Sequence, residues 1–171
     1  LGKTIQAIAT MVSLKNTGST HFVVVCPASV VLNWCREVQK FIKLRVVKVH
    51  GTERLAALED WIDKGGVAVT TYETTMHWKL PEGFYFALLV VDEAHYIKNS
   101  EARRSVYTRA LANRGERLLF MTGTALENNV GEMIQLISVL RPEIARSVSG
   151  MQMLSSAKQF RETVAPVYYR R

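Results

Sequence analysis

One stretch constrains this chain more than any other: the apolar run 87–91, which ends in the carboxylates of Asp92 and Glu93. A short, uncharged and partly β-branched run is typical of a strand buried in a parallel sheet. Such sheets place their chemistry at the carboxyl ends of the strands. An aspartate there suits Mg²⁺, which prefers hard oxygen ligands. Glu93 is then placed to orient a water for attack on a phosphate. The alternative is a solvated acidic turn.

A second motif stands at the start of the chain, where Gly2, Lys3 and Thr4 lead into an apolar helical stretch. A glycine at this place lets backbone N–H groups approach phosphates, and the helix N-terminus favours anions. Lys3 would reach the β- and γ-phosphates of ATP, and Thr4 would share Mg²⁺ with Asp92. P-loop NTPases combine these two motifs. Because the sequence opens inside the motif, we expect the rest of the phosphate loop to lie upstream.

Buried strands alternate with amphipathic helices along the rest of the chain. Strands are expected at 21–26, 45–49, 67–71, 87–91 and 117–121. The expected helices turn three apolar sets inward: Val31, Trp34, Cys35 and Val38; Leu55, Leu58 and Ile62; and Ala102, Val106, Tyr107, Ala110 and Leu111. This alternation predicts an α/β fold, with a mostly parallel sheet and helices on both faces.

The ends of the helices give further expectations. Ser29 and Ser100 are candidate N-caps, because a serine oxygen can accept a bond from the first turn. A last clear helix spans 130–140 and stops before Pro142, and the apolar pattern weakens from Glu143 onward. We therefore expect one lobe over 1–142 and an extension over 143–171.

Composition and charge narrow the possible partners. The 171 residues carry a formal net charge of +7, with a sequence pI near 9.6. A basic chain of this kind makes an acidic partner such as nucleic acid plausible, although a basic soluble domain needs none. Cys26 and Cys35 lack metal-ligand spacing and are expected to be reduced packing thiols in an intracellular protein. No apolar run reaches membrane-spanning length, so we expect no membrane contact.

Five stretches resemble, in order, the motifs of one ATPase family. They are 2–6 (GKTIQ, motif I), 26–29 with 33–37 (CPAS and NWCRE, motif Ia), 70–73 (TTYE, motif Ib), 92–99 (DEAHYIKN, motif II) and 122–129 (TGTALENN, motif III). The chain resembles the first RecA-like lobe of a Swi/Snf-type ATPase, a DNA translocase of helicase superfamily two. The NWCRE and IKN strings separate this group from the RNA helicases that share motif II.

The resemblance implies cofactors, partners and further site residues. It implies ATP with Mg²⁺, duplex DNA, and a second RecA-like lobe that supplies arginine fingers. Lys3, Asp92 and Glu93 would be catalytic. The residues implied to contact the DNA backbone are Ser29, Asn33, Thr71, Tyr72 and Lys98. His95, Thr122 and Thr124 would couple the nucleotide to the DNA side, with a structural histidine and a hydroxyl-rich turn as the alternatives.

Some features depart from the family or remain open. Ala125 stands where the family usually has proline, Glu127 where glutamine is common, and Tyr169 where leucine is usual. We expect Trp34 to be a core residue. The arginine cluster 103–117 is more simply a solvated helix face. By itself, without an arginine finger, the chain is expected to turn over little ATP.

Two other functions remain possible from the sequence. One is a lobe of another superfamily-two motor, such as a restriction-type translocase or an RNA helicase. The other is a nucleotide-binding or protein-docking module without catalysis, against which the intact acidic pair argues. The location would be cytoplasmic in a bacterium and nuclear in a eukaryote.

Overall fold

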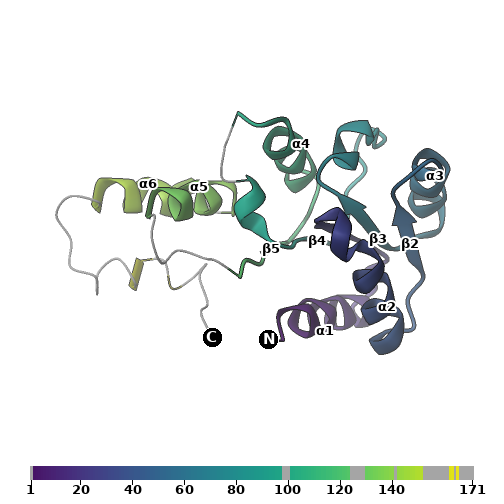
Figure 1. The fold of residues 1–171 in the computed structure, drawn as a ribbon. Coiled ribbons are helices and arrows are strands. Elements are labelled where there is room, and N and C mark those ends of the chain that lie inside the picture. The colour runs from purple at the N-terminus through teal and green to yellow at the C-terminus, as the bar shows by residue number, and fades with distance from the viewer. Residues whose placement is uncertain are drawn as a thin grey trace.

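Five parallel strands form the centre of the computed structural model, in the order β2-β3-β1-β4-β5 (Figure 1). The structure describes residues 2–97, 101–123, 130–140, 142–151, 162–163 and 165. The strands are β1 (His21–Cys26), β2 (Val46–Val49), β3 (Gly66–Thr71), β4 (Leu88–Val91) and β5 (Leu118–Phe120). All five lie where the sequence predicts them, within one residue at either end, and the expected parallel α/β fold is confirmed.

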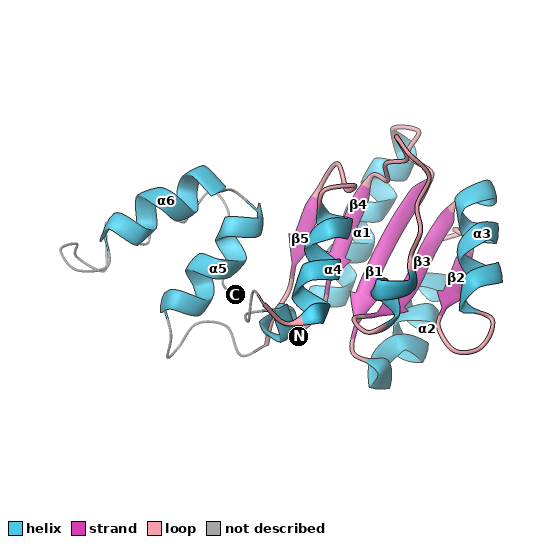
Figure 2. Ribbon diagram, turned by 90° about the horizontal axis from the view of Figure 1, so that it is seen from above, coloured by secondary structure: helices cyan, strands magenta, loops and turns pink. Residues whose placement is uncertain are grey.

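Helices cover both faces of this sheet. Helices α1 (Lys3–Asn16) and α2 (Val31–Phe41) lie on one face, and α3 (Arg54–Lys64) and α4 (Arg103–Ala112) lie on the other. Figure 2 shows α5 (Val130–Leu140) and α6 (Pro142–Met151) beyond the β5 side of the sheet. Three short 3₁₀ turns complete the described elements: η1 (Ala28–Val30), η2 (Thr74–His77) and η3 (Ala94–Ile97). Among the described helices, none is long and apolar enough to cross a membrane.

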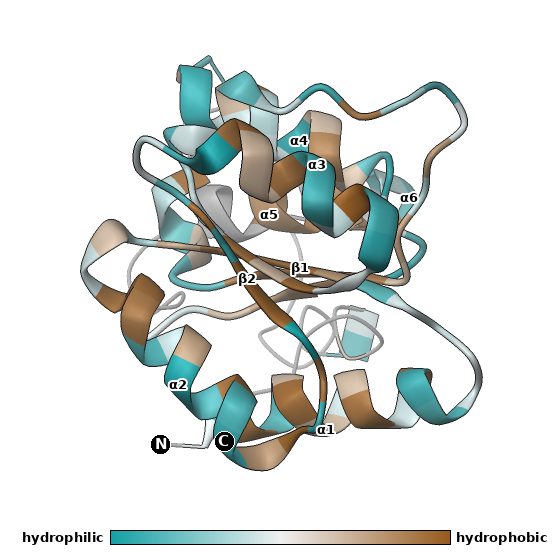
Figure 3. Ribbon diagram, turned by 90° about the vertical axis from the view of Figure 1, so that its right-hand side faces the viewer, coloured by the Kyte–Doolittle hydropathy of each residue, from teal (hydrophilic) through white to brown (hydrophobic). Residues whose placement is uncertain are grey.

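The core is divided by the sheet into two apolar layers. Alternate residues of β1 point to opposite faces, so Phe22 and Val24 join α1 and α2, whereas Val23 and Val25 join α3 and α4. The strands are therefore buried on both faces, which explains why they are continuous apolar runs rather than alternating ones. Figure 3 shows the same arrangement as mostly hydrophobic strands between helices that combine hydrophilic and hydrophobic residues.

Two helix faces differ from the sequence prediction. Helix α3 buries Leu58 and Trp61, the latter completely, and leaves Leu55 55% exposed. Helix α4 leaves Val106 47% exposed and buries a mixed set: Ser105, Thr108, Leu111 and Ala112. This helix packs mainly against turns η2 and η3, where small hydroxyl residues fit, so apolar periodicity identified Leu111 correctly but missed Ser105 and Thr108.

The helix ends also differ from the prediction. The N-cap of α2 is Val30 and that of α4 is Ala102, and neither makes a side-chain cap bond. Ser29 belongs instead to turn η1, so the cap predicted for it is wrong; Ser100 lies outside the described residues. Helix α6 begins at Pro142, where the sequence pattern weakens. The boundary between a lobe and an extension near 142 remains a prediction.

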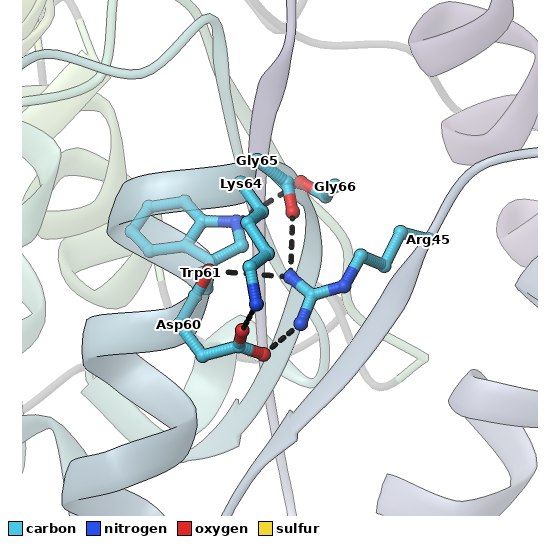
Figure 4. A network of polar contacts seen from close by, with 6 residues as sticks. All are labelled: Arg45, Asp60, Trp61, Lys64, Gly65 and Gly66. Carbon is cyan, nitrogen blue, oxygen red and sulfur yellow. Dashed lines mark hydrogen bonds and ion pairs between the residues drawn. The ribbon is translucent and has the colours of Figure 1, made fainter.

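A polar network closes the sheet at the amino ends of β2 and β3 (Figure 4). We call its residues, Arg45, Asp60, Trp61, Lys64, Gly65 and Gly66, the amino edge. Asp60 pairs with Arg45 and, at 2.8 Å, with Lys64. The indole N–H of Trp61 donates to the Gly66 carbonyl at 3.0 Å. Gly66 has φ +105°, and a Cβ there would lie 2.3 Å from the Arg45 carbonyl oxygen, so only glycine fits.

Candidate active site

The acidic pair occupies a tight turn where β4 ends, and hydrogen bonds hold this turn on both sides. The Asp92 N–H donates to the Val25 carbonyl, and the Ala94 N–H donates to the Met121 carbonyl, both at 2.8 Å. Glu93 between them has φ +53°, a left-handed conformation that costs a non-glycine residue about 1–3 kcal/mol. The turn therefore stores strain at the glutamate that the sequence predicts to be catalytic.

The amino terminus of α1 faces this turn. Gly2, at φ +95°, precedes the helix, and its carbonyl accepts the Gln6 N–H at 3.1 Å. A Cβ placed on Gly123 would lie 3.4 Å from Lys3 Nζ and 3.5 Å from Glu93 Oε1. Lys3 and Glu93, 90 positions apart in the sequence, therefore lie beside the same point. The structure brings together the two motifs that the sequence predicts to share a phosphate site.

The Asp92 carboxylate is held by one donor on each oxygen. The Glu93 N–H donates to Oδ1 at 3.0 Å, and the indole Nε1–H of Trp34 donates to Oδ2 at 2.9 Å. A carboxylate offers about four lone-pair sites, so each oxygen keeps one for a metal or its water. Thr4, in the first turn of α1, is half-buried. This hard-oxygen donor set fits Mg²⁺ with part of its hydration retained.

Tyr72 and Thr71 are buried rather than presented to a partner. Tyr72 is 2% exposed, and its hydroxyl donates to the backbone carbonyls of Asp92 and Glu93, the latter at 3.2 Å. Burial, with the nearby Asp92 charge, raises the Tyr72 pKa above its usual value. Thr71 is 1% exposed and shares a hydroxyl bond with Thr74 at 2.8 Å. The DNA contacts predicted for these two side chains do not agree with their burial.

The remaining predicted residues fall into three groups. His95 Nδ1 lies 3.3 Å from Thr122 Oγ1 and 3.2 Å from Glu93 Oε2, so His95 connects Thr122 to the acidic pair. Ser29 and Asn33 are exposed, on η1 and at the start of α2. Lys98 and Thr124 lie outside the described residues.

Cys26 ends β1 next to this site without taking part in it. It is fully buried, and its thiol donates to the Thr70 carbonyl at 3.6 Å. Burial and the nearby Asp92 charge raise its pKa to about 12, so the thiol stays protonated and unreactive. The predicted reduced state agrees with both cysteines being free.

Sequence reasoning missed two contributors to the site. Trp34 was expected to be core and is 1% exposed, yet its N–H reaches the carboxylate of Asp92. The Gly123 N–H donates to Glu93 Oε2 at 3.2 Å. A buried indole needs a partner for its N–H, and a tryptophan on the face turned to β4 could have suggested one.

A parallel α/β sheet with a glycine-lysine-threonine helix start facing an acidic strand end defines a RecA-like ATPase core. Across all of its length the chain superimposes on 38% of a solved structure, the "Sulfolobus solfataricus SWI2/SNF2 ATPase core in complex with dsDNA", with a TM-score of 0.81 and 26% sequence identity. The SNF2-related domain matches residues 1–163, and the chain belongs to this family.

Relatives in eukaryotes agree with this assignment. The chain is 36% identical over 156 residues to the human "SWI/SNF-related matrix-associated actin-dependent regulator of chromatin subfamily A member 1", covering 86% of this chain and 15% of that protein. It is 34% identical over 169 residues to "ATP-dependent helicase fft1" of Schizosaccharomyces pombe, a match that covers 92% of this chain and 18% of that protein. The chain thus spans less than a fifth of the length of these relatives.

Proposed function

We propose that this chain is the ATP-binding lobe of a DNA-dependent ATPase that moves along duplex DNA and remodels protein–DNA complexes. The observation that carries the proposal is the convergence of Lys3 and Glu93 beside Gly123, next to the Asp92 carboxylate. A cation, a metal-type carboxylate and a second carboxylate at a helix N-terminus are the parts that phosphoryl transfer to water requires.

Each residue has a distinct role in this proposal. Gly2 and the first turn of α1 bind the phosphates through free N–H groups, and Lys3 neutralises their charge. Thr4 and Asp92 would hold Mg²⁺, which would neutralise phosphate charge there. Glu93 orients the attacking water. Its left-handed backbone aims the carboxylate toward Lys3 and Gly123 rather than back along the sheet.

The DNA side of the proposal depends on the exposed start of α2. Ser29 and Asn33 offer a hydroxyl and an amide, which suit phosphate-backbone contacts that position a duplex without reading its sequence. Support comes from the SWI2/SNF2 core that was solved with double-stranded DNA. The chromatin regulator among the relatives supports a nuclear site of action and a chromatin substrate.

A test of this function needs a two-lobe protein that contains this chain, because catalysis also requires the second lobe. We expect duplex DNA, more than RNA, to stimulate its ATP hydrolysis. Glu93→Gln should lower the stimulated rate by roughly 10²–10⁴-fold, the usual worth of a positioned acid–base group. The control Glu59→Gln changes an exposed carboxylate on α3 and should leave the rate unchanged.

The result would also distinguish the other candidate functions. RNA as the better activator would favour an RNA helicase. ATP binding without turnover in the wild-type protein would favour a docking module. Normal turnover by the Glu93→Gln protein would remove the proposed role of that residue.

A further inference from the structure

We infer that Trp34 and Tyr72 are positioning residues that hold the acidic pair, and that Trp34 does so from α2, the helix that carries the exposed predicted DNA contact Asn33. The inference rests on the proposed function and adds to it a route from the DNA side to the metal carboxylate. Neither residue touches the reacting groups; each acts through Asp92 or Glu93.

Trp34 fixes the orientation of the Asp92 carboxylate. Its ring is 1% exposed within the layer between α2 and the sheet, so the indole has little freedom to turn away. Its N–H donates to Oδ2 at 2.9 Å, while Oδ1 accepts the Glu93 N–H. Because both oxygens are held, the carboxylate of Asp92 cannot rotate, and its remaining lone pairs keep a fixed direction. A hydrogen bond to a charged acceptor is also stronger than one between neutral groups.

Tyr72 fixes the backbone of the same turn from the opposite layer. Its hydroxyl donates to the carbonyls of Asp92 and Glu93, which belong to the peptide groups on either side of the left-handed Glu93 Cα. Its ring packs among the residues of the second layer and stacks on Tyr96, with the ring centroids 5.6 Å apart. A strained backbone persists only where its surroundings over-determine it. Tyr72 supplies part of that restraint.

Trp34 also stands next to the exposed residues predicted to meet DNA. Trp34 directly follows the exposed Asn33 in the first turns of α2. Tyr72 directly follows β3 and precedes turn η2. A shift of α2 on a DNA backbone therefore moves the indole N–H relative to Asp92. The DNA signal reaches the metal carboxylate through one hydrogen bond rather than through a long chain of contacts.

The experiment compares three single substitutions in a two-lobe protein that contains this chain. Trp34→Phe keeps a large aromatic ring and removes the N–H. Trp61→Phe is the matched control, because Trp61 is equally buried but donates to the Gly66 carbonyl at the amino edge. Tyr72→Phe removes one oxygen only, and it keeps the test open if Trp34→Phe does not fold.

Two readouts separate positioning from a merely structural role. The first is Mn²⁺ affinity in the presence of ADP, measured by electron paramagnetic resonance without turnover. The second is DNA-stimulated ATP hydrolysis, taken both as its kcat and as its ratio to the basal rate. Trp34→Phe should weaken Mn²⁺ binding and reduce stimulation, each by roughly 10–100-fold, as residues behind a metal ligand usually do. Tyr72→Phe should lower kcat roughly threefold to tenfold with Mn²⁺ affinity unchanged. Trp61→Phe should alter neither readout.

Contrary results have distinct meanings. Mn²⁺ affinity and DNA stimulation of Trp34→Phe equal to those of Trp61→Phe would overturn the role of Trp34. A kcat of Tyr72→Phe equal to that of the wild type would overturn the role of Tyr72. A wild-type protein that DNA does not stimulate would instead refute the proposed function, and the Mn²⁺ measurement would still decide whether Trp34 positions Asp92.

Discussion

The two ends of the parallel sheet solve similar problems with different residues. At the amino edge, a buried tryptophan, Trp61, donates its indole N–H to a backbone carbonyl, and glycines occupy the left-handed positions. At the carboxyl ends of the strands, Trp34 donates to the carboxylate of Asp92, and a glutamate occupies the left-handed position. At the amino edge the left-handed backbone is occupied by glycine, which suits it, whereas at the carboxyl end it is occupied by a residue that does not.

This difference separates stability from function in physical terms. Glycine at φ +105° is unstrained, whereas Glu93 at φ +53° is held there against its preference. A fold selected only for stability would use glycine or asparagine at position 93. In the function proposed above, the carboxylate of Glu93 acts beside Lys3, which accounts for a strained residue at this position. The carboxyl end therefore gives up stability that the amino edge keeps.

The largest expected effect on stability lies at the amino edge. Gly66→Ala should lower the free energy of unfolding by about 3 kcal/mol or more, because its Cβ would overlap the Arg45 carbonyl. Gly51→Ala is the control: its φ is +83°, but nothing lies within 4 Å of the added Cβ. Urea unfolding of both variants measures the difference. If Gly66→Ala lowers the free energy of unfolding no more than Gly51→Ala does, the backbone of the amino edge adjusts to the added Cβ at little cost.

A smaller effect of opposite sign is expected at the carboxyl end. Glu93→Gly should abolish ATP hydrolysis while leaving the free energy of unfolding unchanged or raising it by up to about 1 kcal/mol, as backbone strain is released. Glu59→Gly, in the interior of α3, should lower it by about 1 kcal/mol, the usual cost of glycine in a helix. Thermal unfolding, and ATPase assays of a two-lobe protein that contains this chain, check both variants. A marked destabilisation by Glu93→Gly would show that the turn is not strained.

A third effect concerns Cys26 and depends on pH. Its folded pKa of about 12 lies above that of an unfolded thiol, about 8.5, so only the unfolded chain ionises between these values. Stability from this group is therefore complete below pH 8.5 and is lost as the pH rises toward 12. The free energy of unfolding should fall less steeply from pH 8 to 10 in Cys26→Ala than in the wild type.

Alkylation gives an independent check of the same difference. The half-buried Cys35 also has a raised pKa, through burial. Iodoacetamide at pH 8.5, followed by mass spectrometry, should label Cys35 before Cys26. Faster labelling of Cys26 would contradict its burial beneath the site.

Much of the fold follows from local pattern. Each strand is a short apolar run, and because both of its faces are buried the run is continuous, which makes it easy to recognise. Helix faces were less predictable. Trp61 was overlooked in favour of Leu55, because periodicity alone does not tell which side of α3 meets the sheet. In α4, Ser105 and Thr108 are buried although their chemistry suggests a surface.

For the site, the sequence predicted which residues converge but not how they are held. The spacing of motifs predicted Lys3 beside the acidic turn. The indole donor on Asp92 and the left-handed backbone of Glu93 depend on contacts between residues 58 positions apart and on a single torsion angle. Likewise, the chemistry of Tyr72 allows either a surface contact or a buried hydrogen bond, and the sequence does not show that its side chain is buried.

The two outer strands of the sheet differ in a way that matters for handling the protein. Among the described strands, β2 and β5 each have a neighbour on one side only. Strand β2 carries Lys48, whose charge discourages further pairing, whereas β5 reads Leu118, Leu119 and Phe120, all partly exposed. An uncharged, open strand is a template for self-association. When this lobe is prepared alone, β5 is the edge strand to cover with another segment or to change by substituting a charged residue.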